Sequence, residues 1–172
     1  MNRVLQRLDS TRHKLHQAVS PLADELYSQR PAQDEWSVAE IVQHMDLVEA
    51  RVLKELEDGI AGPPRRVKLL RRLIPTSIVS SRLIKVTAPR AVTPSDPPSK
   101  NVALANLDRT RGRLKEFCAT YGNERLRNLV FKHPFLGDID GVATVSFLSY
   151  HEQRHYKQIQ ETLKRLAADS RG

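Results

Sequence analysis

Four stretches of the sequence repeat apolar residues at intervals of three and four, the spacing of one buried face of an α-helix. They cover approximately residues 3–28, 37–58, 99–121 and 142–166. The chain has only seven glycines, and aromatic residues make up 5% of it. This pattern predicts an all-α fold in which the four helices pack as a bundle.

Local signals refine the first two helices. Pro21 is expected to kink or split the first one, because a proline inside a helix removes a backbone hydrogen bond. Ser37 and Glu40 have the spacing of a capping box, which predicts the start of the second helix. Gly59 is its expected end, because glycine is common just past a helix C-terminus.

A long connection separates the second helix from the third. Pro63 and Pro64 block the second helix from continuing, residues 65–73 predict a short basic amphipathic turn, and residues 77–86 predict a short helix. About forty residues are far more than a tight helical hairpin needs. They are enough to cross the length of a bundle, so we expect the second and third helices to run parallel.

The second half of the chain is expected to contain two long helices and an irregular link. The third helix carries Thr110 and Arg111 on its apolar stripe and is expected to end at Gly122 and Asn123. Residues 124–141 are expected to be mostly irregular. At 172 residues we expect a single domain, with a basic, proline-rich insertion at about residues 60–100.

The positive charge is concentrated in that insertion. The whole chain has 28 basic and 20 acidic residues. Between Gly59 and Ser95 there are no acidic residues and eight basic ones: Arg65, Arg66, Lys68, Arg71, Arg72, Arg82, Lys85 and Arg90. A solvated surface is the simplest interpretation, and an electropositive lid for an anionic substrate is an alternative. Nucleic-acid binding is disfavoured, because this segment has no aromatic side chain on which bases could stack.

Other features bear on the cellular setting. The single cysteine, Cys118, allows no internal disulfide, which fits a reducing compartment. The N-terminus turns polar before an apolar signal region develops, and no run of 18 apolar residues exists. We therefore expect a cytoplasmic protein without a transmembrane segment.

Three histidines occupy core positions of the predicted helices. His44 lies on the apolar stripe of the second helix, and His151 and His155 lie one turn apart on that of the fourth. An imidazole in an apolar core is costly unless its nitrogens have partners. If the two helices are antiparallel neighbours, helix rise brings the three to a similar level. Three ligands with an open position are typical of a catalytic metal site.

The segment from His151 to His155 also has the H-E-x-x-H form of zinc proteases, in which the glutamate is a general base. A protease is disfavoured, because Gln158 stands where the extended motif requires glycine. Glu152 is therefore a weak candidate for polarising a water at the metal, and is as well explained as an exposed helix residue. His133 is expected to pack or cap a loop, and His13 and His16 to be solvated.

Three segments together resemble the DinB-like superfamily, which includes the YfiT-like proteins. They are Trp36–His44 (WSVAEIVQH), His133–Gly137 (HPFLG) and His151–Ile159 (HEQRHYKQI). The resemblance implies a four-helix bundle with a crossover between the second and third helices. It also implies a zinc or nickel ion held by His44, His151 and His155, and chemistry that is either hydrolysis or transfer involving a low-molecular-weight thiol. A homodimer is compatible with it.

Two functions follow from the sequence. The favoured one is a metal-dependent hydrolase or thiol-dependent S-transferase acting on a small molecule. The alternative is a non-catalytic binding module that contacts an anionic partner through residues 65–90. Substrate-binding candidates are the aromatic residue before the capping box and four arginines of the insertion: Trp36, Arg65, Arg66, Arg71 and Arg72.

Overall fold

A computed structural model describes residues 1–67, 89–133 and 136–169. The helices are α1 (Asn2–Val19), α2 (Asp24–Ser28), α3 (Val38–Ile60), the 3-10 helix η3 (Arg90–Val92), α4 (Lys100–Arg127) and α5 (Gly141–Asp169). Two short strands, β1 (Val130–His133) and β2 (Gly137–Asp140), lie between α4 and α5. The short helix predicted at residues 77–86 and most of the basic turn predicted at 65–73 fall outside the described residues.

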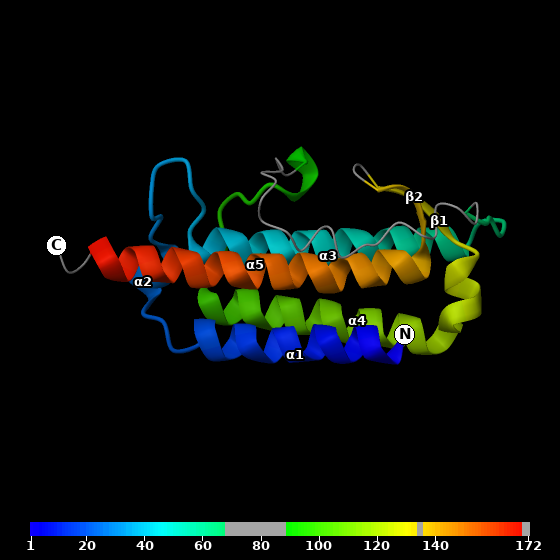
Figure 1. Ribbon diagram of the computed structural model, residues 1–172, viewed down its shortest axis with the longest axis horizontal. Helices are drawn as coiled ribbons and strands as arrows, with labels where there is room; N and C mark the ends of the chain where they lie inside the picture. The colour runs from blue at the N-terminus through cyan, green and yellow to red at the C-terminus, as the bar shows by residue number, and fades with distance from the viewer. Residues whose placement is uncertain (68–88, 134–135, 170–172) are drawn as a thin grey trace.

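The four long helices α1, α3, α4 and α5 form the predicted bundle (Figure 1). α3 and α4 run in the same direction, and α1 and α5 run opposite to them. The crossover between the second and third long helices is thereby confirmed. α3 and α5 are antiparallel neighbours, the arrangement that the three core histidines require. Within the described residues, no helix is both long and apolar enough to span a membrane.

The predicted starts and ends of the first two helices are close to those observed. The first stretch is split, with α1 ending at Val19 and α2 beginning at Asp24, because Pro21 cannot donate a helical hydrogen bond. The Ser37 side chain accepts from the Glu40 amide, and the Glu40 carboxylate accepts from the Ser37 amide. The capping box is therefore confirmed, and α3 runs one residue past Gly59.

The irregular link predicted at residues 124–141 is wrong. Gly122 does break α4, with φ of 64° and ψ of 175°, but the helix resumes and ends at Arg127. An antiparallel hairpin follows, in which Phe131 pairs with Ile139. Each strand has four residues, too few for a readable alternation. Packing onto the bundle decides the structure here, since Leu129 and Ile139 are buried in its core.

The core consists of two apolar clusters, one toward each end of the bundle. Each long helix contributes apolar residues to both clusters. Between these two sets of apolar residues, each helix has at least one charged or imidazole side chain. On α1, for example, Leu8 belongs to one cluster and Leu15 to the other, and the buried Arg12 lies between them. The middle of the bundle is therefore a polar layer, and it contains all the chemistry described below.

Candidate metal centre

The structure brings His44, His151 and His155 together (the histidine cluster). Their candidate ligand nitrogens all lie within 4.8 Å of one another. The Nε2 atoms of His44 and His151 are 3.2 Å apart. Two nitrogens bound to one tetrahedral zinc at 2.0–2.1 Å would be about 3.3 Å apart. The donor set and its spacing therefore fit a divalent metal ion.

Hydrogen bonds on the far side of two of these rings fix their orientation. His44 Nδ1 lies 2.7 Å from the backbone oxygen of Val92, and His155 Nδ1 lies 2.8 Å from the side-chain oxygen of Gln158. A carbonyl oxygen only accepts, so each Nδ1 carries a proton, and in the neutral form of either ring the lone pair is on Nε2. Such outer partners are typical of metal-binding histidines.

Burial favours the neutral form of two of these imidazoles. Loss of hydration lowers the pKa of His44 below its usual value of 6.5. The pKa of His151 is lowered well below 6.5, first by loss of hydration and then by the positive charges that His155 and His44 would carry if protonated. Because a metal ion binds only the neutral form of an imidazole, these shifts favour binding at neutral pH.

Aromatic side chains pack around the cluster. The Trp36 ring centroid lies 5.0 Å from that of His44, and the Phe147 centroid 5.4 Å from that of His151. His133 lies behind Phe147, at 4.5 Å, and its Nδ1 accepts from the Leu136 amide. His133 is thus outside the cluster, in the packing and capping position expected for it. Of the substrate-binding candidates among the described residues, Trp36 is the one that lies beside the histidines.

Glu152 is neither exposed nor directed at the cluster, so its interpretation as an exposed helix residue is wrong. It is 4% exposed. Its Oε1 accepts from Arg12 Nε at 2.8 Å, and its Oε2 accepts from Arg111 Nη2 at 2.8 Å. Both oxygens are therefore held by guanidinium groups, and the structure gives no support to Glu152 as a general base. It faces the other half of the polar layer.

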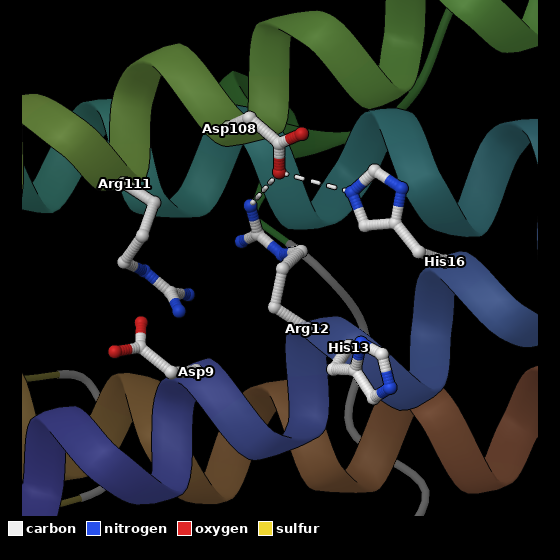
Figure 2. A pocket seen from close by; sticks show the side chains of 6 residues that line it. All are labelled: Asp9, Arg12, His13, His16, Asp108 and Arg111. Atoms are coloured by element: carbon white, nitrogen blue, oxygen red, sulfur yellow. Dashed lines mark hydrogen bonds and ion pairs between the residues drawn. The ribbon is translucent and has the colours of Figure 1, made fainter.

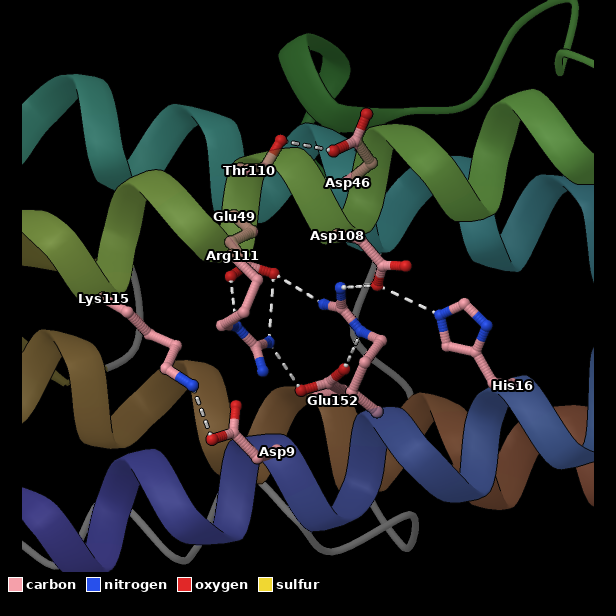
Figure 3. Close-up of polar contacts among 10 residues, drawn as sticks. Asp9, His16, Asp46, Glu49, Asp108, Thr110, Arg111, Lys115 and Glu152 are labelled. Carbon is pink, nitrogen blue, oxygen red and sulfur yellow. Dashed lines mark hydrogen bonds and ion pairs between the residues drawn. The ribbon is translucent and has the colours of Figure 1, made fainter.

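That half is a closed ring of two arginines and two glutamates (Figure 3). Arg12 Nη2 donates to Glu49 Oε2 at 2.9 Å, and Arg111 donates to both Glu49 oxygens at 2.6 and 3.1 Å. With the two contacts of Glu152, the four charges alternate and sum to zero. The residues come from α1, α3, α4 and α5, one from each helix. We call Arg12, Glu49, Arg111 and Glu152 the Arg–Glu ring.

The ring is not predicted by the helical pattern, although the sequence contains a signal for it. Each member has core spacing on its helix: Arg12 follows Leu8 by four, Glu49 follows Met45 by four, Arg111 precedes Leu114 by three and Glu152 follows Leu148 by four. Arg111 lies on the predicted apolar stripe of its helix, but the pattern predicts no role for it. Charged residues at core positions on all four helices indicate mutual pairing, because an unpaired buried charge is very costly.

A surface pocket of about 320 Å³ lies on the outer side of the ring, between α1 and α4 (Figure 2). It is lined by Asp9, Arg12, His13, His16, Asp108 and Arg111. His16 Nε2 lies 3.0 Å from Asp108 Oδ1, and both side chains are partly exposed. His13 is exposed, as predicted. This pocket is larger than the cavity of about 10 Å³ that His151 lines. It nevertheless lies on the far side of the Arg–Glu ring from the histidine cluster.

Two of the four arginines proposed as substrate contacts, Arg65 and Arg66, lie away from the cluster. Arg65 and Arg66 follow the C-terminus of α3, where the Arg65 amide donates to the Asn128 carbonyl and Arg66 Nε to the Asn128 side chain. His44 lies near the opposite end of that helix, about 24 Å away by helix rise. Arg71 and Arg72 lie outside the described residues.

The fold and the cluster together define a class: a crossover four-helix bundle with three inward histidines fit for a metal ion. A sequence profile of the DinB superfamily matches residues 7–159. The chain therefore belongs to the DinB superfamily. Among curated proteins it is similar to the uncharacterised protein YuaE of Bacillus subtilis (strain 168), with 26% identity over 146 residues, which are 84% of this chain and 88% of YuaE.

Two solved structures share the fold. YfiT from Bacillus subtilis, described as a probable metal-dependent hydrolase with an unusual four-helix bundle topology, superposes with a TM-score of 0.67 at 17% identity. The match covers 96% of this chain and 87% of YfiT. TT2238, a four-helix bundle protein, gives a TM-score of 0.62 at 21% identity, covering 93% of this chain and 98% of TT2238.

Proposed function

We propose that this protein is a metal-dependent enzyme in which His44, His151 and His155 hold a divalent ion, zinc or nickel. The observation that carries the proposal is the convergence of the two Nε2 atoms at 3.2 Å, with Nδ1 of His44 bonded to a backbone carbonyl. The same 3.2 Å contact is also the length of a hydrogen bond from a protonated His151 Nε2 to His44 Nε2. A metal ion would instead accept lone pairs from all three imidazoles at once, which fits the presence of His155 in the cluster.

We further propose that the reaction is hydrolysis of a small molecule or transfer of a low-molecular-weight thiol to it. A bound divalent ion supplies Lewis-acid chemistry, which activates a water or a thiol near neutral pH. The chain's own contribution is to hold three imidazoles in place and to pack Trp36 and Phe147 against them, which exclude bulk water from one side. The description of YfiT as a probable metal-dependent hydrolase favours hydrolysis.

The first test is metal content. Untagged protein is analysed for metals beside His151→Ala and a control, His133→Ala, which removes an imidazole close to the cluster but outside it. We expect about one zinc or nickel per chain in the wild type and in the control, and less than about a tenth of that in His151→Ala. A wild-type protein that stays empty after incubation with either metal would contradict the proposal and favour the binding-module alternative.

The second test concerns turnover. Metal-free and reconstituted protein are assayed with thioesters, lactones and amides for hydrolysis, and with thiols and an electrophilic acceptor for transfer. Activity should follow metal occupancy and be lost in His44→Ala and His155→Ala. Equal activity in the metal-free protein would mean that catalysis does not use this site.

A further inference from the structure

The Arg–Glu ring connects all four long helices through one closed set of ion pairs. Each glutamate accepts from the same two arginines, and the side chains are between 4% and 8% exposed. Glu49 and Glu152 come from α3 and α5, the two helices that carry the histidine cluster. Arg12 and Arg111 come from the two helices that carry none of it. The arginines therefore hold the two histidine-bearing helices to each other.

The Arg–Glu ring lies next to the cluster. Glu152 follows His151 in the sequence, so a shift of the backbone at Glu152 also moves His151. A cavity of about 10 Å³, roughly the space of one water molecule, is lined by all four ring members, Met45, Leu148 and His151.

Stability alone does not explain such a ring. Removing four charges from water carries a large desolvation cost, and buried ion pairs can often be replaced by apolar side chains of similar size without loss of stability. The ring is also incomplete in its hydrogen bonding, because Arg111 Nη1 is buried without a partner among the described residues. What charged side chains add is direction, because their hydrogen bonds hold only over a narrow range of positions.

We infer that the Arg–Glu ring is a positioning device, which sets the alignment of α5 against α3 so that the three imidazoles converge before a metal ion arrives. This inference rests on the proposed function. A slide or rotation of α5 by one residue would break the contacts of Glu152 with Arg12 and Arg111 together. The apolar clusters on either side cannot impose the same alignment, because hydrophobic contacts are non-directional.

The test replaces the ring with apolar side chains of similar size in the full chain. The variant combines Arg12→Met, Glu49→Leu, Arg111→Met and Glu152→Leu. Cobalt(II) is the probe, because its visible absorption reports the ligand number and geometry of the site independently of any activity. Urea denaturation of the metal-free proteins measures stability in parallel. We expect a folded variant whose cobalt affinity is at least tenfold weaker and whose absorption bands are altered.

Two controls separate positioning from general effects. The double variant Glu57→Leu and Arg113→Met removes an exposed ion pair of 2.7 Å between α3 and α4. Leu8→Ala weakens the apolar cluster near one end of the bundle. Both should keep cobalt affinity within twofold of the wild type and leave the spectrum unchanged, although Leu8→Ala lowers the stability.

Every outcome is informative. A folded ring variant that binds cobalt within twofold of the wild type, with the same spectrum, would overturn the inference and leave the proposed function intact. A wild-type protein that binds no cobalt would overturn both. If the fourfold variant does not fold, Glu152→Gln takes its place, because it keeps the shape of the side chain and weakens both arginine contacts. Unchanged affinity in that variant would equally overturn the inference.

Discussion

The polar layer of this bundle contains two neighbouring groups of side chains that differ in how they are satisfied. In the Arg–Glu ring, every carboxylate oxygen accepts from a guanidinium of the same ring, and the charges cancel. In the histidine cluster, the Nε2 atoms of His44 and His151 face each other at 3.2 Å, and His155 adds a third imidazole. The carboxylates of the Arg–Glu ring are satisfied within the protein, whereas the cluster gathers three nitrogen donors that a cation can bind.

This difference bears on which half of the layer is the better candidate for binding a ligand. The Arg–Glu ring has more charge, and the larger pocket lies beside it, at about 320 Å³ against about 10 Å³ for the cavity at His151. Pocket size and charge density would both favour the Arg–Glu ring. The side-chain chemistry favours the cluster instead, because the carboxylates of the Arg–Glu ring already accept from guanidiniums, whereas three imidazoles converge in the cluster.

The largest change in the free energy of unfolding is expected for a substitution in the Arg–Glu ring. Arg111→Ala leaves Glu49 and Glu152 buried with a single arginine between them, so the free energy of unfolding should fall by about 3–5 kcal/mol. Arg113→Ala, on the exposed face of the same helix, should cost less than about 1 kcal/mol. Urea denaturation measures both. Equal losses would mean that the ring is solvated in solution.

The next effect concerns the cluster and pH. Burial lowers the pKa of His44 and of His151 below 6.5, so below that pH the unfolded chain binds more protons than the folded one. The contribution of these two histidines to the free energy of unfolding of the metal-free protein should be fully present above pH 6.5. It should be lost as the pH falls toward their pKa values in the folded state. The slope is at most about 1.4 kcal/mol per pH unit for each histidine.

Denaturation curves between pH 7.5 and 5.5 test this expectation, with His151→Gln as the comparison. The substituted protein should show a shallower fall, because one of the two titrating groups is gone. Identical slopes in the two proteins would show that His151 is already protonated, or already solvated, in the folded state.

The smallest effect is expected at the outer partner of His155. Gln158→Leu removes the side-chain oxygen that lies 2.8 Å from His155 Nδ1. Metal affinity should weaken by about tenfold, at the low end for such partners, while the number of ions per chain stays at one. Competition with a chromogenic chelator measures this. A change in metal affinity of less than twofold would mean that packing alone orients the imidazole of His155.

Much of the fold could be predicted from the sequence, because long periodic stripes and one capping box were enough to locate all four long helices. Pro21 gave the division between α1 and α2. The hairpin could not be predicted, because its four-residue strands are stabilised by burial of Leu129 and Ile139 against the bundle and not by a local pattern.

The candidate site divides in the same way. His44, His151 and His155 could be found because each lies on an apolar stripe. The carbonyl of Val92, which fixes the orientation of His44, could not, because a backbone oxygen in a connection leaves no sequence signal. Glu152 was misassigned, because the H-E-x-x-H motif suggests a role at the metal, whereas Arg12 and Arg111, far away in the sequence, determine where its carboxylate lies.

The sequence separation of the ring members has a consequence for how the protein is made. Arg12 and Glu152 are 140 residues apart, on the first and last long helices. While the chain is being synthesised, α1, α3 and α4 emerge with Arg12, Arg111, Glu49 and the half-exposed Asp108, but without Glu152. The buried ring can therefore be completed only when α5 has left the ribosome. The polar layer thereby ties its own assembly to the end of synthesis.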